Sequence, residues 1–200
     1  MHPYHKGGRE AFWHDQVEGF AGGDWPWGIV AWSERKSSAE CVSVRDLTFA
    51  AMAQAVEMWN TNKRDAYFVG EAAYGHWLGW LRDVDCGQVD DPKAGMQGNG
   101  WCFDVLIHYR LIAGRWLKQK ADDFQGEAAK QLGTAADHYA QIAELCLMDL
   151  SSPWDLTLGP SRYDEWSSEL RQAQIARLEA ARENDRAATR AIEATLQSLG

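Results

Sequence analysis

The sequence predicts a mainly α-helical domain, with about five helices in a bundle and a short N-terminal β-hairpin. After residue 43, apolar side chains recur at spacings of three and four, which is typical of amphipathic helices. Before it, paired glycines and a Trp-Pro-Trp segment interrupt any long helix. The chain is 46% apolar and 24% charged, as globular domains are. We therefore expect a Trp-rich segment with short strands at 1–42 and a helical domain at 43–200.

The N-terminal segment is expected to contain the hairpin. Residues 27–32 are β-branched and aromatic and follow Pro26, so they are predicted to form a strand. Residues 41–44 are its expected partner across a polar loop. An isolated hairpin is marginally stable in water, so this one must pack on another element.

The helical domain is expected to begin at Ser43, which precedes Asp46 by three positions and so resembles a capping box. The helices are predicted at 44–59, 66–82, 101–117, 126–150 and 163–198. The acidic, Gly-rich stretch 83–100 is predicted to be a loop.

Three of these helices carry long apolar stripes that we expect to face the core. In the third helix the stripe comprises Cys102, Val105, Leu106, Tyr109, Ile112, Ala113, Trp116 and Leu117. In the fourth it comprises Leu132, Ala135, Tyr139, Ile142 and Cys146. The last helix has a seam of small and polar residues at Leu178, Ala181, Asp185, Ala188, Ile192, Thr195 and Leu199.

Charge and cysteine usage limit the function classes. The net charge of −9 disfavours binding to phosphate backbones and anionic lipid, so no nucleic-acid or membrane partner is expected. The four cysteines are widely spaced without a Cys-x-x-Cys pair, and neither a signal peptide nor a long apolar run is evident. These features predict a soluble, cytoplasmic protein with reduced thiols.

Candidate catalytic residues are few. Asp104 and His108 are four positions apart, so a helix would place them on one face, where a carboxylate can orient a general base. The alternative is an ordinary surface pair. Cys41 lies near the expected start of a helix, which favours a thiolate, but no histidine is close to it in sequence. We assign no catalytic residue on this basis.

No metal site or cofactor is predicted. The histidines at positions 2, 5 and 14 are separated from any rigid element by Gly7 and Gly8 or by distance in sequence. The chain contains no His-Glu-x-x-His motif. The N-terminal tryptophans could instead line an aromatic pocket or pack the hairpin onto the helices.

Five segments carry a resemblance to a known family. They are Trp25-Pro26-Trp27-Gly28-Ile29-Val30, Ala55-Val56-Glu57-Met58-Trp59, Gly70-Glu71-Ala72-Ala73-Tyr74-Gly75-His76-Trp77, Arg110-Leu111-Ile112-Ala113-Gly114-Arg115-Trp116-Leu117 and Ala135-Ala136-Asp137-His138-Tyr139. In this order they resemble the C-terminal helical region of proteins related to butirosin biosynthesis protein H, over roughly residues 24–196. The N-terminal half of that group resembles a papain-like cysteine peptidase.

The resemblance implies acyl transfer or amide hydrolysis by a Cys and a His of the papain-like half. This chain lacks that region, so no catalytic residue is transferred, and residues 27–32 would be the last strand of the missing domain. The chain is therefore expected to be a fragment or a stand-alone helical descendant. The candidate ligand-binding residues are Trp25, Trp27, Trp32, Tyr74, Trp77 and Arg110.

The sequence favours a non-catalytic helical accessory domain that binds a small ligand or a partner protein. A protein partner or a second copy is expected to bind through the N-terminal Trp-rich segment. The alternative is a small hydrolase or acyltransferase that uses a Cys/His or His/Asp pair. A third hypothesis, an immunity or inhibitor protein, rests only on the acidic charge.

Overall fold

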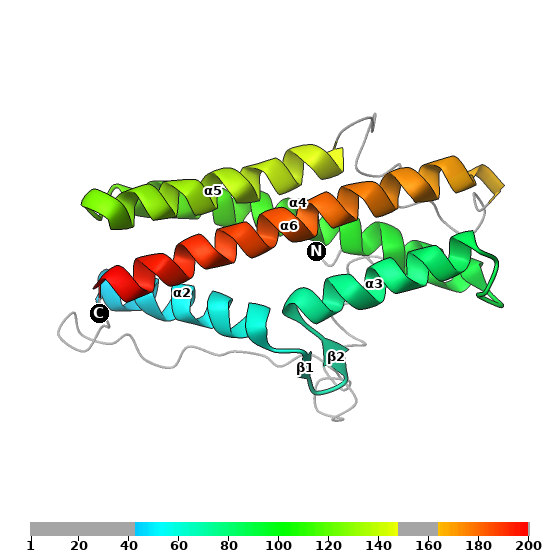
Figure 1. Ribbon diagram of the computed structural model, residues 1–200, viewed down its shortest axis with the longest axis horizontal. Helices are drawn as coiled ribbons and strands as arrows, with labels where there is room; N and C mark the ends of the chain where they lie inside the picture. Colours follow the sequence, from blue (N-terminus) through cyan, green and yellow to red (C-terminus); the bar gives the residue numbers. More distant parts are fainter. Residues whose placement is uncertain (1–42, 148–163, 200) are drawn as a thin grey trace, which may run out of the picture. The chain divides into compact units, whose positions relative to one another are not determined.

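The computed structural model describes residues 43–147 and 164–199. This part of the chain is mainly α-helical, as predicted, with five helices packed together and one two-stranded antiparallel hairpin (Figure 1). The elements are α2 (Val44–Asn60), β1 (Lys63–Arg64), β2 (Tyr67–Phe68), α3 (Gly70–Asp85), α4 (Pro92–Ala121), α5 (Gly126–Leu147) and α6 (Ser168–Leu199). The strand predicted at 27–32 and the proposed boundary after residue 42 lie outside the described residues.

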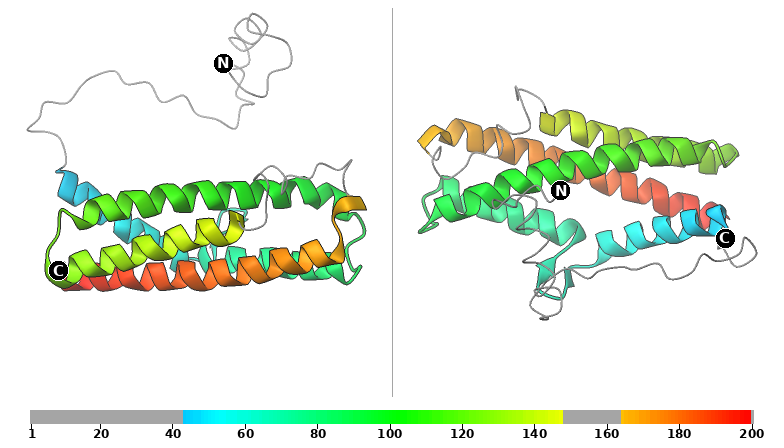
Figure 2. Two further views of the ribbon diagram at one scale, coloured as in Figure 1. Left: turned by 90° about the horizontal axis from the view of Figure 1, so that it is seen from above. Right: turned by 180° about the vertical axis from the view of Figure 1, so that it is seen from behind.

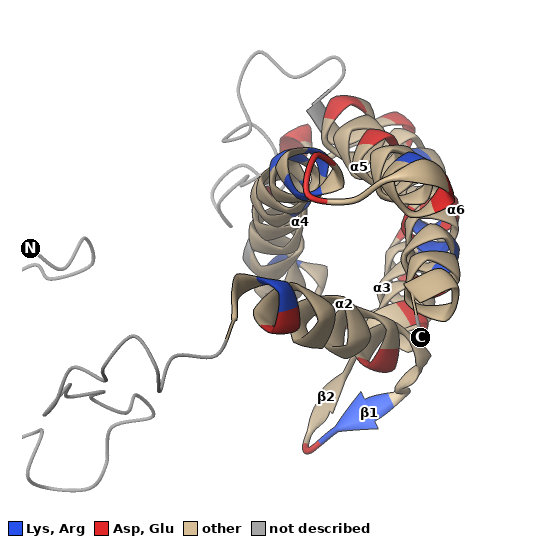
Figure 3. Cartoon of the chain, turned by 90° about the vertical axis from the view of Figure 1, so that its left-hand side faces the viewer, with Lys and Arg blue, Asp and Glu red and all other residues tan. Residues whose placement is uncertain are grey.

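The helices are arranged around one common axis (Figure 3). Helix α5 packs along α4 on one side and along α6 on the other, and these are the closest helix pairs. Helices α2 and α3 follow one another along α6, with the hairpin projecting between them (Figures 1 and 2). The bundle therefore has four sides, of which the α2–α3 side is made of two shorter helices.

The core confirms the periodicity predicted for α5 and α6. The buried members of the two predicted stripes are Leu132, Ala135, Tyr139, Ile142, Cys146, Leu178, Ala181, Asp185, Ala188, Ile192 and Thr195, whereas Leu199 is half-buried. The small side chains of α6 let it approach its neighbours closely while the larger residues of α5 fill the space between them. No helix within the described residues is both long and apolar enough to cross a membrane.

The start of α2 also follows the prediction. The Ser43 hydroxyl oxygen accepts a hydrogen bond from the Asp46 backbone N–H at 3.0 Å and so caps the helix. Because Val44 is already helical, the second strand of the predicted N-terminal hairpin cannot extend to this residue. The rest of that hairpin lies outside the described residues.

The predicted start of the second helix at Ala66 is wrong. Residues 63–68 form the hairpin, in which Lys63 pairs with Phe68 and Arg64 with Tyr67, and α3 begins only at Gly70. The physical reason is the backbone conformation: φ is 53° at Asp65 and 55° at Gly70. A right-handed helix cannot pass through residues in the left-handed region.

Gly70 also permits a close approach between α2 and α3. A Cβ atom at this position would lie 2.2 Å from the Trp59 carbonyl oxygen, which belongs to the backbone. A side chain of any kind would therefore force the two helices apart, in addition to straining φ. Gly70 therefore sets the position of the break on this side of the bundle, which is the interruption between the end of α2 and the start of α3.

Gly70→Ala should lower the free energy of unfolding by about 2 kcal/mol or more, from the strain at positive φ and the backbone contact. Gly75→Ala in the same helix is the matched control, because a Cβ there meets nothing within 4 Å. That change should raise stability by about 0.5–1 kcal/mol through helix propensity. Urea unfolding followed by circular dichroism measures both, and equal effects of the two changes would contradict the prediction.

The loop predicted at 83–100 is much shorter, because α4 begins at Pro92. The Asp91 carboxylate accepts a hydrogen bond from the Ala94 N–H at 3.3 Å, and proline is favoured in the first turn of a helix. Gly95 lies against the Trp80 ring, where a Cβ would be 2.2 Å from Cζ2. Tertiary packing thus overrides the low helix propensity of the glycines.

Only part of the apolar stripe predicted for the third helix faces the core, against which Leu106, Ala113 and Trp116 pack half-buried. Tyr109 is 64% exposed, Ile112 62% and Val105 38%, whereas Leu117 is buried. The buried face also carries Phe103 and Ile107. Helix α4 has two apolar faces, and only one of them packs on α5.

The last helix begins five residues later than predicted. The Ser167 hydroxyl oxygen accepts a hydrogen bond from the Leu170 N–H at 3.3 Å, and α6 runs from Ser168. Ser168 and Arg171 donate hydrogen bonds to the Asp85 carboxylate at 2.7 and 2.9 Å. These contacts join the end of α3 to the start of α6.

Candidate functional site

An apolar groove of about 580 Å³ lies between α3 and α4, beside the end of α2. Its lining residues are Trp59, Gly70, Ala73, Tyr74, Trp77, Trp101, Cys102, Val105, Leu106, Tyr109 and Arg110. The groove exists because the break between α2 and α3 faces the middle of the longer helix α4. The second apolar face of α4 therefore forms one wall.

Aromatic contacts join the α2–α3 side to α4 and to the turn that follows α4. The Phe49 and Phe124 rings meet edge to face with centroids 6.1 Å apart, at the start of α2. The Trp77 and Phe103 rings meet with centroids 4.6 Å apart, in the groove wall. These contacts hold the two sides together on either side of the break.

Trp77 is held in place by a chain of buried hydrogen bonds. Its indole Nε1–H donates to Asn99 Oδ1 at 2.7 Å, and the Asn99 amide donates to Gln174 Oε1 at 3.2 Å. The Trp166 indole donates to the same Gln174 oxygen at 3.0 Å. Because each buried group has a partner, this network fixes the groove wall without an unsatisfied polar group.

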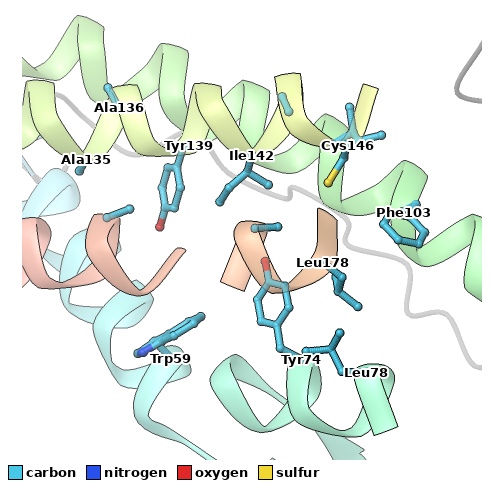
Figure 4. Close-up of a cluster of buried hydrophobic side chains, with 14 of the residues drawn as sticks. Trp59, Tyr74, Leu78, Phe103, Ala135, Ala136, Tyr139, Ile142, Cys146 and Leu178 are labelled. Atoms are coloured by element: carbon cyan, nitrogen blue, oxygen red, sulfur yellow. The ribbon is translucent and has the colours of Figure 1, made fainter. Parts of the chain in front are cut away.

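A charged cluster lies at the base of the groove. Asp185 of α6 is 1% exposed, and its Oδ2 accepts hydrogen bonds from the Tyr74 hydroxyl at 2.8 Å and from Arg110 Nε and Nη2 at 3.0 and 2.7 Å. The Tyr139 ring lies 5.1 Å from the Arg110 guanidinium carbon. Tyr74 and Tyr139 project from α3 and α5 toward the middle of the bundle (Figure 4).

Arg110 keeps its charge in the folded protein. Burial opposes the charge on Arg110, but the combined attraction of Asp185, Tyr74 and Tyr139 and the hydrogen bond to Asp185 outweigh it, so the pKa of Arg110 lies above its ordinary value. Burial, followed by the negative charge of Asp185, raises the pKa of Tyr74 well above 10.0. The Tyr74 hydroxyl therefore remains a hydrogen-bond donor across the physiological pH range.

Alkaline pH should destabilise the protein through buried thiol and phenol groups in and beside this site, among them Cys146 and Tyr139. Burial raises the pKa of Cys146 from 9.0 to about 12, and burial likewise raises that of Tyr139 from 10.0 to about 12. Since the unfolded chain loses these protons first, stability should be constant below about pH 9 and fall toward pH 12, by about 1.4 kcal/mol per pH unit and group.

Urea unfolding at pH 8, 10 and 11 measures this fall. In Cys146→Ala the fall between pH 9 and 10 should be shallower, because one buried thiol no longer contributes while Cys102 and the tyrosines still do. The comparison uses the slope of the free energy of unfolding against pH. Removing the thiol side chain also changes stability by a constant amount, but that amount does not alter the slope. An unchanged pH profile in the variant would show that Cys146 does not contribute.

The structure brings together three of the candidate ligand-binding residues. Tyr74, Trp77 and Arg110 all line the groove. Trp25, Trp27, Trp32 and Cys41 lie outside the described residues, so their roles stay predictions. Sequence reasoning missed Trp59, Val105 and Asp185 as parts of the site. The one signal for Asp185 was a carboxylate within the apolar seam of α6.

The candidate pair Asp104 and His108 does form a contact. His108 Nδ1–H donates to the Asp104 backbone carbonyl at 2.8 Å, and the same nitrogen lies 3.1 Å from Oδ1 of the Asp104 side chain. The His108 side chain is 58% exposed, and neither residue lines the groove. This geometry is that of an exposed pair on one helix face, which is the alternative also expected from the sequence.

The groove does contain one thiol, that of Cys102. Burial raises the pKa of this thiol, so it stays protonated at neutral pH and is a poor nucleophile. Among the described residues, no group of three or more His, Cys, Asp or Glu side chains is placed to hold a metal ion. The chemistry that the groove offers is apolar contact and hydrogen bonding.

The fold and the groove define a helical-bundle protein with an aromatic-lined groove over a buried Arg–Asp pair. Comparisons of the chain with protein-family models, with curated proteins and with solved structures found no match. The resemblance to the helical region of butirosin biosynthesis protein H relatives therefore stays a prediction. Any functional conclusion has to rest on the groove itself.

Proposed function

We propose that this domain is a non-catalytic binding domain that takes a small, largely apolar molecule into the α3–α4 groove. The observation that supports it is the groove's composition. Its volume of about 580 Å³ falls in the range of small-molecule sites, and its walls are mostly aromatic and aliphatic. A few polar groups, among them Tyr74 and Arg110, converge at its base.

The groove's walls are held before any ligand enters, which favours binding. Trp77 is fixed through Asn99, and Tyr74 through Asp185. Side chains that are already ordered lose little rotamer entropy when a ligand contacts them. Val105 and Tyr109 on the opposite wall are exposed apolar surface that a ligand would cover.

Binding accounts for the site better than the alternative of a small hydrolase or acyltransferase. No imidazole is present among the described residues that line the groove, and its thiol is not activated. Nucleophilic catalysis needs a nucleophile and a base within hydrogen-bond reach. The proposed accessory role also agrees with the predicted family resemblance, in which the catalytic Cys and His belong to another domain.

A neutral aromatic probe, 2-naphthylacetamide, tests the proposal in saturation-transfer NMR and calorimetry. Val105→Trp places an indole in the groove and should weaken binding by at least about tenfold, equivalent to about 1.4 kcal/mol. Ile112→Trp is the matched control, because Ile112 is a β-branched residue of the same helix that is 62% exposed and does not line the groove.

The control variant should bind the probe as the wild type does. Equal binding by Val105→Trp, or equal loss in both variants, would show that the probe does not occupy the groove. Circular dichroism and thermal unfolding of both variants establish that the bundle is intact. An intact wild type that binds no probe at all would overturn the proposed function.

A further inference from the structure

We propose that the ligand of this groove carries a carboxylate, which binds the guanidinium of Arg110 while a flat apolar body lies between the aromatic walls. The inference rests on the proposed function and names its ligand class: a small aromatic or similarly flat monocarboxylate. It follows from the way the hydrogen-bond donors of Arg110 are used.

Arg110 is the only charged residue among the described residues that line the groove, and its side chain is 29% exposed. A guanidinium has five N–H donors in a planar fork. Asp185 takes the donors on Nε and Nη2, both through one carboxylate oxygen. Within the described residues, Nη1 has no hydrogen-bond acceptor, so donors remain for a ligand.

The geometry of these donors suits a carboxylate. The edge of the fork that carries Nη1 and the second hydrogen of Nη2 lies away from the Nε–Nη2 edge that meets Asp185. Two parallel N–H groups on one edge match the two oxygens of a carboxylate, and such charge-assisted pairs are about twice as strong as neutral hydrogen bonds. An amide or ketone oxygen would use only part of this edge.

The charges favour an anion over a cation, although aromatic walls by themselves can attract cations. A cation in the groove would meet Arg110, whose pKa lies above its ordinary value and which is therefore charged. The carboxylate that could attract a cation, Asp185, is 1% exposed, and its Oδ2 already accepts three hydrogen bonds. Asp185 is thus turned toward Arg110 and Tyr74 rather than toward a ligand.

The stacking surfaces define the rest of the ligand. Trp59, Trp77 and Trp101 contribute indole rings to the groove, and Tyr109 a phenol ring. Flat rings bury large areas against such walls with offset or edge-to-face contacts. A ligand with one flat apolar body and one carboxylate would therefore use both the walls and the base.

Three probes that share one ring system test the inference by calorimetry: 2-naphthylacetate, the neutral 2-naphthylacetamide and the cation 2-(2-naphthyl)ethylammonium. The wild type should prefer the acetate over the amide by at least about tenfold, the difference expected for a charge-assisted hydrogen-bond pair. The cation should bind more weakly than the amide.

Two variants separate recognition by Arg110 from a structural role. Arg110→Lys keeps the charge beside Asp185 but loses the planar fork, so the acetate preference should fall while amide binding is retained. Asp185→Asn keeps an acceptor oxygen for Arg110 but removes the competing charge, so acetate affinity should rise above the wild type. A loss of stability cannot produce such a gain.

The outcomes are distinct. If the amide binds the wild type and the acetate binds no better, or if the cation binds best, the carboxylate inference is wrong and the groove proposal stands. If the affinity for the acetate does not rise in a folded Asp185→Asn variant, Arg110 does not bind the ligand carboxylate. If none of the three probes binds, the proposed function fails, and the inference fails with it.

Discussion

Arg110→Met should lower the free energy of unfolding by about 3–5 kcal/mol, the cost of leaving one partner of a buried ion pair alone. Asp185 would remain 1% exposed without its cation, and its Oδ2 would keep only the Tyr74 hydroxyl as a donor. The cost arises from the uncompensated carboxylate rather than from lost packing, because methionine retains much of the apolar stem.

The triple variant with Arg110→Met, Asp185→Leu and Tyr74→Phe distinguishes these causes. It removes all three polar partners together, so no buried charge or hydroxyl is left unsatisfied. Its stability should return to within about 1–2 kcal/mol of the wild type, since well-packed apolar residues replace buried ion pairs at little cost. Urea unfolding followed by circular dichroism gives both values at one pH and salt concentration.

A small effect of Arg110→Met would contradict the description of the pair as buried. A triple variant that is less stable than Arg110→Met would contradict it as well. In the first case the Asp185 carboxylate would have to be hydrated once Arg110 is removed. The cluster would then contribute to ligand recognition only, and the stability of the bundle would depend on its apolar contacts.

Phe103→Ala should cost about 3–5 kcal/mol, the range for removing a fully buried phenylalanine ring. Phe103 is 0% exposed and does not itself line the groove, and its ring contacts that of Trp77 with centroids 4.6 Å apart. The variant should therefore also weaken 2-naphthylacetamide binding, because Trp77 loses part of the contact that fixes it in the wall.

Ile112→Ala is the control for this prediction. It lies on the same helix but is 62% exposed, so the substitution should change stability by no more than about 0.5 kcal/mol. The two variants also test the orientation of α4. If Ile112→Ala were costly and Phe103→Ala were not, the stripe predicted from sequence would face the core after all.

The candidate site could be predicted from sequence only in part. Tyr74 and Trp77 are three positions apart, so the sequence by itself places them on one face of a helix. Arg110 and Asp185 are 75 positions apart and belong to different helices, so nothing local relates them. Their pairing requires α4 and α6 to be placed by the core.

Helices α5 and α6 were determined by the sequence itself. Each carries one apolar stripe at three- and four-residue spacing, and a helix with a single stripe can bury only that face. The Ser43 cap is local in the same way, because its hydroxyl reaches an N–H three positions along the chain. Local periodicity and capping chemistry are sufficient for these features.

The tertiary structure alone decided the orientation of α4 and the position of the α2–α3 break. Helix α4 has two apolar faces, and the spacing of its apolar residues does not indicate which face the neighbouring helix covers. The break depends on the approach of Gly70 to the Trp59 carbonyl and on the left-handed backbone at Asp65. The groove results from both features, because its walls are the uncovered face of α4 and the helix ends at the break.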